Sequence, residues 1–186
     1  MEFRFEIATL NDIPRIRELI AASVRMLQIE YTPEQREAAL ATVFTVDSQL
    51  VADGTYFLAF STDNRLAACG GWSKRKTLYG GDHQIEAIAA DLLDPTIDAA
   101  KIRAIFVHPD FARQGLGSTV LKYSEDAAAR EGFTHFEMGS TLAGMPLYQL
   151  KGYVALKEGA EIDVPVGDGR SISIVRMAKR IDRSYS

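Results

Sequence analysis

Cysteine is almost absent from this chain of 186 residues, because Cys69 is the only one. A single thiol excludes an intrachain disulfide framework and a zinc site built from several thiolates. The three histidines, His83, His108 and His135, are dispersed and lack the spacing of metal ligands. We therefore expect no bound metal, and the lack of disulfides fits a reducing, cytoplasmic location.

The chain also lacks a strong excess of one charge and any long hydrophobic run. Its 21 basic and 25 acidic residues give a net charge of −4, and both signs are scattered along the sequence. This balance argues against nucleic acid or an anionic membrane as a partner. The apolar runs are far shorter than a membrane span, and residues 1–6 resemble a first strand rather than a signal peptide. We expect a single domain over residues 1–186.

Hydrophobic periodicity predicts a mixed α/β chain. The expected strands are 3–7, 56–60, 65–73, 101–107, 133–139, 153–156 and 170–178, and the expected helices are 13–27, 33–40, 117–131 and 145–151. The strand at 101–107, the helix after it and the strand at 133–139 follow one another directly, which predicts a right-handed crossover between parallel strands. Antiparallel wings are expected on both sides. Residues 74–98 are expected to be mostly irregular, and irregular stretches of that length are often functional.

The most informative segment covers residues 103–118. It reads as a strand that stops at Pro109, a basic loop containing Gly115 and Gly117, and the start of a helix. Such a loop exposes backbone N–H groups at the positive end of a helix dipole, which suits a phosphate or pyrophosphate. A dinucleotide fingerprint would need a third glycine where Val120 stands, and a P-loop would need a lysine directly after its last glycine, where Ser118 stands. The alternative is a structural glycine pair that lets the helix pack closely on the strand.

Two segments resemble the GCN5-related N-acetyltransferases, the GNAT family. In that family a strand ending in Val-x-Pro runs into Arg/Gln-x-x-Gly-x-Gly/Ala, and here residues 107–109 are Val-His-Pro and residues 112–117 are Ala-Arg-Gln-Gly-Leu-Gly. Ala112 departs from the pattern, because Arg or Gln is usual at that position. Residues 141–153 are similar to a later segment, in which a short helix carries a tyrosine, here Tyr148, and ends in Gly-Phe or Gly-Tyr. Ala143 replaces an asparagine that is often found there.

The resemblance implies an acyl-CoA N-acyltransferase fold, with a central mixed sheet, a parallel strand pair that splays apart, and helices on both faces. It implies acetyl-CoA as co-substrate, with the pantetheine arm along the central strand and the pyrophosphate on the glycine loop. The implied cofactor-binding residues are Ile105, Phe106, Val107, Ala112, Arg113, Gln114, Gly115, Leu116, Gly117 and Ser118. Tyr148 is the implied catalytic residue, because a phenol can donate a proton to the departing sulfur. Its alternative role is aromatic packing near a helix end.

The sequence does not identify the general base that would deprotonate the amine. A lysine-like amine has a pKa of about 10.4, so only about one molecule in a thousand is neutral at pH 7. Some members of the family use a glutamate on or near the central strand, where this chain carries Arg103. Asp82, Glu86 and Glu137 are candidate substitutes, acting directly or through water. A water chain without a dedicated base is the alternative.

The acceptor pocket is expected among the first helices and the later strands, as the resemblance implies. Trp72, Asp82 and Glu86 are the candidate substrate-binding residues, together with Tyr31 and Tyr79. An aromatic and acidic mixture would suit a cationic amine. Packing is the simpler explanation for Trp72 and Tyr79.

The leading interpretation is an N-acetyltransferase that transfers an acetyl group from acetyl-CoA to a primary amine of a small molecule, peptide or protein by direct attack in a ternary complex. A non-catalytic acyl-CoA-binding sensor or interaction module of the same fold is the alternative, favoured by Ala112 and by the undefined base. A binder of a different nucleotide is a weaker third interpretation. An edge strand near the C-terminus would allow a homodimer.

Overall fold

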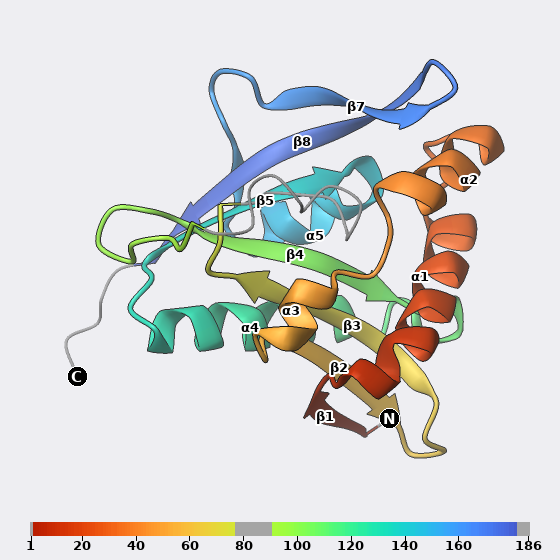
Figure 1. Cartoon of the computed structure of the whole chain (residues 1–186), viewed down its shortest axis with the longest axis horizontal. Coiled ribbons are helices and arrows are strands. Elements are labelled where there is room, and N and C mark those ends of the chain that lie inside the picture. Colours follow the sequence, from red (N-terminus) through yellow and green to blue (C-terminus); the bar gives the residue numbers. More distant parts are fainter. Residues whose placement is uncertain (1, 77–90, 182–186) are drawn as a thin grey trace.

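The computed structural model describes residues 2–76 and 91–181, and Figure 1 shows the arrangement of its elements. The strands are β1 (Phe3–Ile7), β2 (Tyr56–Ser61), β3 (Leu66–Ser73), β4 (Ala100–Val107), β5 (His135–Thr141), β6 (Val154–Ala155), β7 (Glu161–Gly167) and β8 (Arg170–Arg180). The α-helices are α1 (Ile13–Leu27), α2 (Pro33–Thr42), α3 (Ser48–Ala52), α4 (Leu116–Arg130) and α5 (Met145–Leu150). Short 3-10 segments are η1 (Leu10–Asp12), η3 (Pro109–Phe111) and η4 (Leu142–Gly144). None of the helices in the described ranges is long and apolar enough to cross a bilayer.

The described strands form one mixed sheet of eight strands in the order β1-β2-β3-β4-β5-β8-β6, with β7 paired to β8. The β4–β5 pair is parallel and the other pairs are antiparallel. The mixed α/β fold and the parallel crossover through α4 are therefore confirmed. Domain organisation over residues 1–186 stays a prediction.

Two elements fall outside the sequence prediction, β7 and the five-residue α3. In β7, Val164 and Val166 are buried in alternation with exposed positions. Pro165 lies between them, and a proline argues against a strand in a sequence pattern because it cannot donate to a ladder. The proline is tolerated here because β7 pairs with β8 alone and lies at an edge of the sheet.

The first helix shows how the sequence positions one wall of the site. Ile16, Leu19, Ile20 and Val24 recur at helical spacing and are buried against the sheet. A proline occupies the first turn, as predicted, where its missing N–H is not needed. The helix ends at Leu27, and Gln28 is its C-cap. The Gln28 N–H still bonds to the Val24 carbonyl, but the Gln28 backbone is no longer helical.

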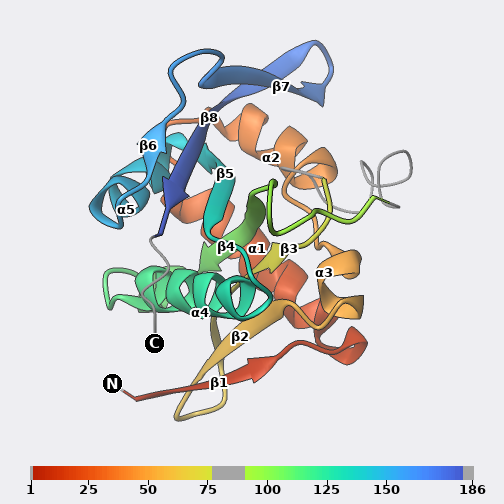
Figure 2. The same cartoon turned by 90° about the vertical axis from the view of Figure 1, so that its left-hand side faces the viewer.

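Alternation along the central strands divides the core between two faces of the sheet. In β2, Leu58 and Phe60 join the cluster that packs under α1, whereas Ala59 joins Leu116 and Val120 of α4. The two helices contact the same strands, β3 and β4, and their positions can be followed in Figure 2. Helices therefore cover both faces, as the fold class requires.

The parallel pair β4–β5 is joined at one end only. Its register consists of Ala100 with Phe136 and Lys101 with Glu137. Beyond Lys101 the two strands continue without pairing to each other. The sheet therefore contains a splayed parallel pair, as the resemblance implied.

A β-bulge in β4 accompanies this separation. Ala104 and Ile105 of β4 lie opposite one residue of β3, Gly70, and Ala104 has a left-handed φ of 54°. A Cβ atom at Gly70 would lie 2.7 Å from Cγ1 of Ile105 and 2.8 Å from Cγ1 of Val120. Only glycine allows this close approach, and the bulge redirects β4 where it leaves β5.

Candidate active site

The loop between β4 and α4 presents backbone donors rather than side-chain caps. Arg113 and Gly115 have left-handed φ values of 64° and 80°. Gly115 is the N-cap of α4, and no side chain caps the first turn. The first N–H groups of a helix have no intrahelical partner, and the helix dipole makes this end positive. The loop therefore has the chemistry of an anion site.

A cleft of about 480 Å³, called the outer cleft below, lies between this loop, β4 and α5. Of the residues predicted to bind the cofactor, only Gln114 does not line it. The nine predicted residues that line it are Ile105, Phe106, Val107, Ala112, Arg113, Gly115, Leu116, Gly117 and Ser118. A Cβ at Gly117 would lie 3.0 Å from Cδ2 of Leu147 and 3.7 Å from Cγ2 of Val107, so this glycine keeps the cleft wall thin.

A second and smaller hollow lies deeper, between α1, β4 and β5. This inner cavity has a volume of about 80 Å³. Its walls are Gln28, Val43, Phe44, Thr45, Ile102, Arg103, Ala104, Ile105, Phe106, Met138, Gly139, Thr141, Tyr148 and Ile174. The residues that it shares with the outer cleft are Gln28, Ile105, Phe106, Thr141 and Tyr148. The two hollows therefore meet where β4 and β5 separate.

Tyr148 stands at this junction. The side chain comes from α5 and is 9% exposed, and it lines both the outer cleft and the inner cavity. A Cβ at Gly144 would lie 2.9 Å from Cε2 of Tyr148, so glycine at 144 leaves room for the ring. Burial raises the pKa of the Tyr148 phenol well above its usual value, because the phenolate would be poorly solvated. The hydroxyl therefore stays protonated at neutral pH and can donate a hydrogen bond.

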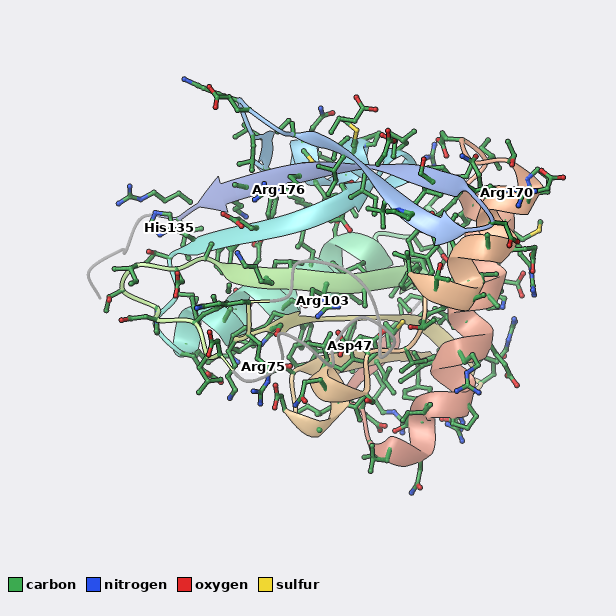
Figure 3. All side chains as sticks on the ribbon, turned by 45° about the horizontal axis from the view of Figure 1, so that its top comes forward. Asp47, Arg75, Arg103, His135, Arg170 and Arg176 are labelled. Atoms are coloured by element: carbon green, nitrogen blue, oxygen red, sulfur yellow. The ribbon has the colours of Figure 1, made fainter. Side chains whose placement is uncertain are left out.

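A buried ion pair lies beside the inner cavity. Arg103 Nη1 is 2.8 Å from Asp47 Oδ2, and the two side chains are 4% and 1% exposed. Figure 3 shows the two side chains meeting from β4 and from the start of α3. Asp47 Oδ1 also accepts a hydrogen bond from the Leu50 N–H, so it caps α3. The pair ties the bulged strand to the segment between α2 and α3.

Several residues of the predicted site lie elsewhere. Trp72 is 1% exposed and packs edge-on against Phe133 with ring centroids 5.7 Å apart. It lines neither the outer cleft nor the inner cavity, so packing accounts for its position. Asp82 and Glu86, with Tyr79, lie outside the described residues.

Two further candidates are engaged in structural contacts. Glu137 Oε2 is 2.7 Å from Lys101 Nζ at the paired end of β4 and β5, away from both hollows. Tyr31 is buried and donates a hydrogen bond of 2.6 Å to the Ser173 carbonyl. Burial raises the pKa of Tyr31 to about 12, and its hydroxyl links the α1–α2 connection to β8. Neither position suits a base or an acceptor contact.

Sequence reasoning missed Gln28, Thr45 and Thr141, which line the inner cavity. It also missed Asp47. The only local signal is that the apolar helical pattern of α1 ends at Gln28. The others become neighbours of Tyr148 only through the packing of α1 and the α2–α3 connection on the sheet.

Comparison with known proteins settles the family. The model of the acetyltransferase (GNAT) family matches residues 21–153, which is more than half of the chain. The chain belongs to the GNAT acetyltransferase family. The match contains the bulged strand, the glycine loop and α5.

Solved GNAT structures show the same fold at low sequence identity. A GCN5-related N-acetyltransferase from Rhodopseudomonas palustris has a TM-score of 0.69 and 18% identity, with 97% of each chain covered. PaiA N-acetyltransferase from Thermoplasma acidophilum, in complex with coenzyme A, has a TM-score of 0.63 and 12% identity, over 97% of this chain and 100% of that chain. YncA from Salmonella typhimurium, described as a putative acetyltransferase with its cofactor acetyl-CoA, has a TM-score of 0.62 and 16% identity, over 100% and 98%. No curated protein matches the chain.

Membership of the GNAT family makes acyl transfer the general class of reaction. Within the described residues, no group of three or more His, Cys, Asp or Glu side chains could hold a metal ion. Cys69 is fully buried, and burial raises the pKa of its thiol to about 12. The polar side chains that the two hollows share are the Tyr148 phenol, the Gln28 amide and the Thr141 hydroxyl.

Proposed function

We propose that this GNAT protein is an N-acetyltransferase that moves an acetyl group from acetyl-CoA to a primary amine by direct attack. The observation that carries the proposal is the meeting of two hollows at Tyr148. An acyl donor in the outer cleft and an amine in the inner cavity would approach each other at the phenol. Holding two reactants in this way contributes about 7–11 kcal/mol in favourable cases.

The residues of the outer cleft fit acetyl-CoA. The pyrophosphate would rest on the N–H groups of residues 113–118, where left-handed Arg113 and Gly115 shape the loop. The edge of β4 that separates from β5, at residues 105–107, would pair with the pantetheine amides. Ala112 removes one side chain usual in the family, but the donors of this loop are mostly backbone groups. Two of the similar structures are described with coenzyme A or acetyl-CoA bound, which supports this assignment.

The reaction forms a C–N bond, breaks the thioester C–S bond, and moves one proton from nitrogen to sulfur. Tyr148 is the group positioned to give its hydroxyl proton to the leaving sulfur. The proton lost by the nitrogen restores the phenol, so the enzyme returns to its starting state. A phenol is protonated at neutral pH, so this donor carries its proton when the reaction begins.

No carboxylate lines the inner cavity within the described parts of the chain. The amine can instead arrive neutral, because burial in the cavity disfavours the charged ammonium and lowers the pKa of a bound amine. This arrangement supplies a nucleophile without a dedicated base at the described residues.

The lack of a carboxylate among the described residues of the inner cavity also supports one alternative function, a non-catalytic acyl-CoA sensor. Incubation of the purified chain with acetyl-CoA and a panel of amines, followed by measurement of free thiol, separates the two functions. Thiol release that depends on both the amine and the Tyr148 hydroxyl supports the enzyme. Coenzyme A binding by calorimetry without thiol release for any amine supports the sensor. A cytoplasmic location and a homodimer stay predictions.

A further inference from the structure

Two buried polar atoms line the inner cavity without a hydrogen-bond partner among the described residues. They are Oε1 of Gln28 and Oγ1 of Thr45. Gln28 is 6% exposed, so its amide is held inside the protein rather than in water. A buried polar atom left without a partner is costly, and such atoms in native proteins usually mark a site for water or a ligand.

Apolar side chains form one part of the remaining wall. Val43 and Phe44 directly follow α2, and Met138 and Ile174 come from β5 and β8. The charged wall residue Arg103 is already paired with Asp47 at 2.8 Å. Besides the Gln28 amide and the Thr45 hydroxyl, the walls hold the Thr141 hydroxyl, the Tyr148 phenol and Arg103, so apolar and polar groups share the cavity.

Its size limits what can enter. A cavity needs about 10–15 Å³ of accessible space to hold one water molecule. On that scale the inner cavity, at about 80 Å³, holds about five to eight heavy atoms. A long or branched polycation does not fit within it, although part of a larger molecule could extend toward the outer surface.

We propose that the acceptor is a primary monoamine with a compact hydrocarbon substituent, and that Gln28 and Thr45 bind its nitrogen. This inference rests on the proposed acetyltransferase function and names the substrate class of the same site. Oε1 of Gln28 accepts one N–H, and Oγ1 of Thr45 accepts the second. The lone pair of a neutral amine is then left for attack on the thioester carbonyl.

Under this proposal a neutral amide and a hydroxyl suit the reacting nitrogen better than a carboxylate would. A carboxylate beside the amine would favour the ammonium form, which cannot attack. An amide and a hydroxyl hold the nitrogen without stabilising the extra proton to the same extent. A second cationic group or a substrate carboxylate would lose its hydration in this small cavity, so we expect both to be selected against.

The test compares three amines with the full chain and acetyl-CoA: isobutylamine, spermidine and glycine. Free thiol gives kcat/KM for each, and calorimetry measures binding of isobutylamine to the chain saturated with coenzyme A. We expect kcat/KM for isobutylamine to exceed the other two values by tenfold or more. Thr45→Val and Gln28→Leu are each expected to raise KM and Kd for isobutylamine by about tenfold, the loss expected for a hydrogen bond to a buried group.

The variants are chosen to fold. Replacing a buried polar group that lacks a partner by an apolar group of similar shape is close to neutral for stability, which thermal denaturation checks. Thr45 lines the inner cavity but not the outer cleft, so Thr45→Val should leave coenzyme A affinity unchanged. Gln149→Leu is the matched control for Gln28→Leu, because Gln149 is exposed on α5 and lines neither hollow.

Preference for spermidine or glycine overturns the acceptor class while the acetyltransferase function stands. Unchanged isobutylamine KM and Kd in both cavity variants overturn the binding roles of Gln28 and Thr45. Absence of thiol release with every amine, in a chain that binds coenzyme A, instead overturns the proposed function and this inference with it.

Discussion

The two ends of the β4–β5 pair differ although they belong to the same two strands. At the closed end, Ala100 and Lys101 pair with β5, and Lys101 is 2.7 Å from Glu137 across the pair. At the open end, residues 105–107 of β4 face the outer cleft. Backbone groups bond within the sheet at one end and are left for another partner at the other. Because buried backbone groups require partners, the open end is where a ligand is expected to add its own amides.

The comparison separates stability from function along one strand. The closed end is held by backbone pairing and a partly buried ion pair, and neither residue of that pair lines a hollow. The open end carries the bulge, the glycine loop and the junction at Tyr148. Changes at the closed end should therefore act on stability, and changes at the open end should act on binding or turnover.

The largest effect is expected at the open end, from Tyr148→Phe. General acid catalysis contributes about 10²–10⁴-fold, so kcat for thiol release should fall by about that factor. Coenzyme A binding should remain, because the ring still fills its place beside Gly144. Tyr123→Phe is the control, since Tyr123 is 42% exposed on α4 and lines neither hollow. Turnover equal to that of the unaltered chain would assign Tyr148 to packing alone.

The buried Arg103–Asp47 pair beside the inner cavity gives the second effect, on stability. Asp47→Asn keeps an oxygen to accept the Leu50 N–H but removes the negative charge that faces Arg103. Breaking a buried pair costs about 3–5 kcal/mol of unfolding free energy, because a buried charge loses its counter-charge. Urea denaturation measures the change.

An exposed ion pair provides the comparison for Asp47. Asp126→Asn, opposite Lys122 with side chains 45% and 72% exposed, should change unfolding free energy by less than about 1 kcal/mol. Equal effects of the two asparagine variants would show that burial of the Arg103–Asp47 pair has no energetic consequence.

The third change, Gly115→Ala, tests the glycine loop. A left-handed backbone costs an alanine about 1–2 kcal/mol, and a tenfold rise in Kd corresponds to about 1.4 kcal/mol. We therefore expect coenzyme A affinity, measured by calorimetry, to weaken by about tenfold as the loop shifts its N–H groups.

Gly159 allows backbone strain to be separated from the loss of ligand contacts. It has a φ of 60° in the connection between β6 and β7 and does not line the outer cleft. Gly159→Ala should introduce similar strain and leave coenzyme A affinity intact. A matching loss of affinity in both variants would argue against a role for the glycine loop.

The smallest effect is expected at the closed end, from Glu137→Gln. The pair with Lys101 is partly exposed, at 13% for the lysine and 28% for the glutamate side chain. Its loss should lower the free energy of unfolding by about 1 kcal/mol or less, in the range of exposed ion pairs. Coenzyme A affinity and kcat should not change. A large fall in turnover would restore Glu137 as a candidate base and contradict the division between the two ends.

Local pattern predicted much of the fold because periodicity reports which face of each element is buried. The strand at β4, the helix α4 and the strand β5 were predicted within two residues of their observed bounds, and their parallel arrangement follows from their direct connection. The glycine loop was predicted because a left-handed backbone position just before a helix favours glycine, and Gly115 occupies that position. By contrast, β7 was missed because Pro165 argues against a strand in the sequence pattern. A proline is compatible with an edge strand, but only the tertiary structure shows that β7 lies at the edge of the sheet.

The candidate site divides in the same way. Nine of the ten predicted cofactor-binding residues line the outer cleft, because they are consecutive in a strand, a loop and a helix start. Trp72 shows the limit of this reasoning. Its chemistry suited a cationic acceptor, but alternation along β3 and the packing of Phe133 assign it to the core.

The sequence by itself indicated the mixed α/β class and the glycine loop, because these depend on neighbours within a few residues, and it indicated Tyr148 through the resemblance of residues 141–153 to a GNAT segment. The tertiary structure alone decided that β4 leaves β5 beyond Lys101, that Arg103 meets Asp47, and that Gln28 and Thr45 share a cavity with Tyr148. These contacts join elements far apart in the chain, and they arise from the bulge opposite Gly70 and from the packing of α1 on the sheet.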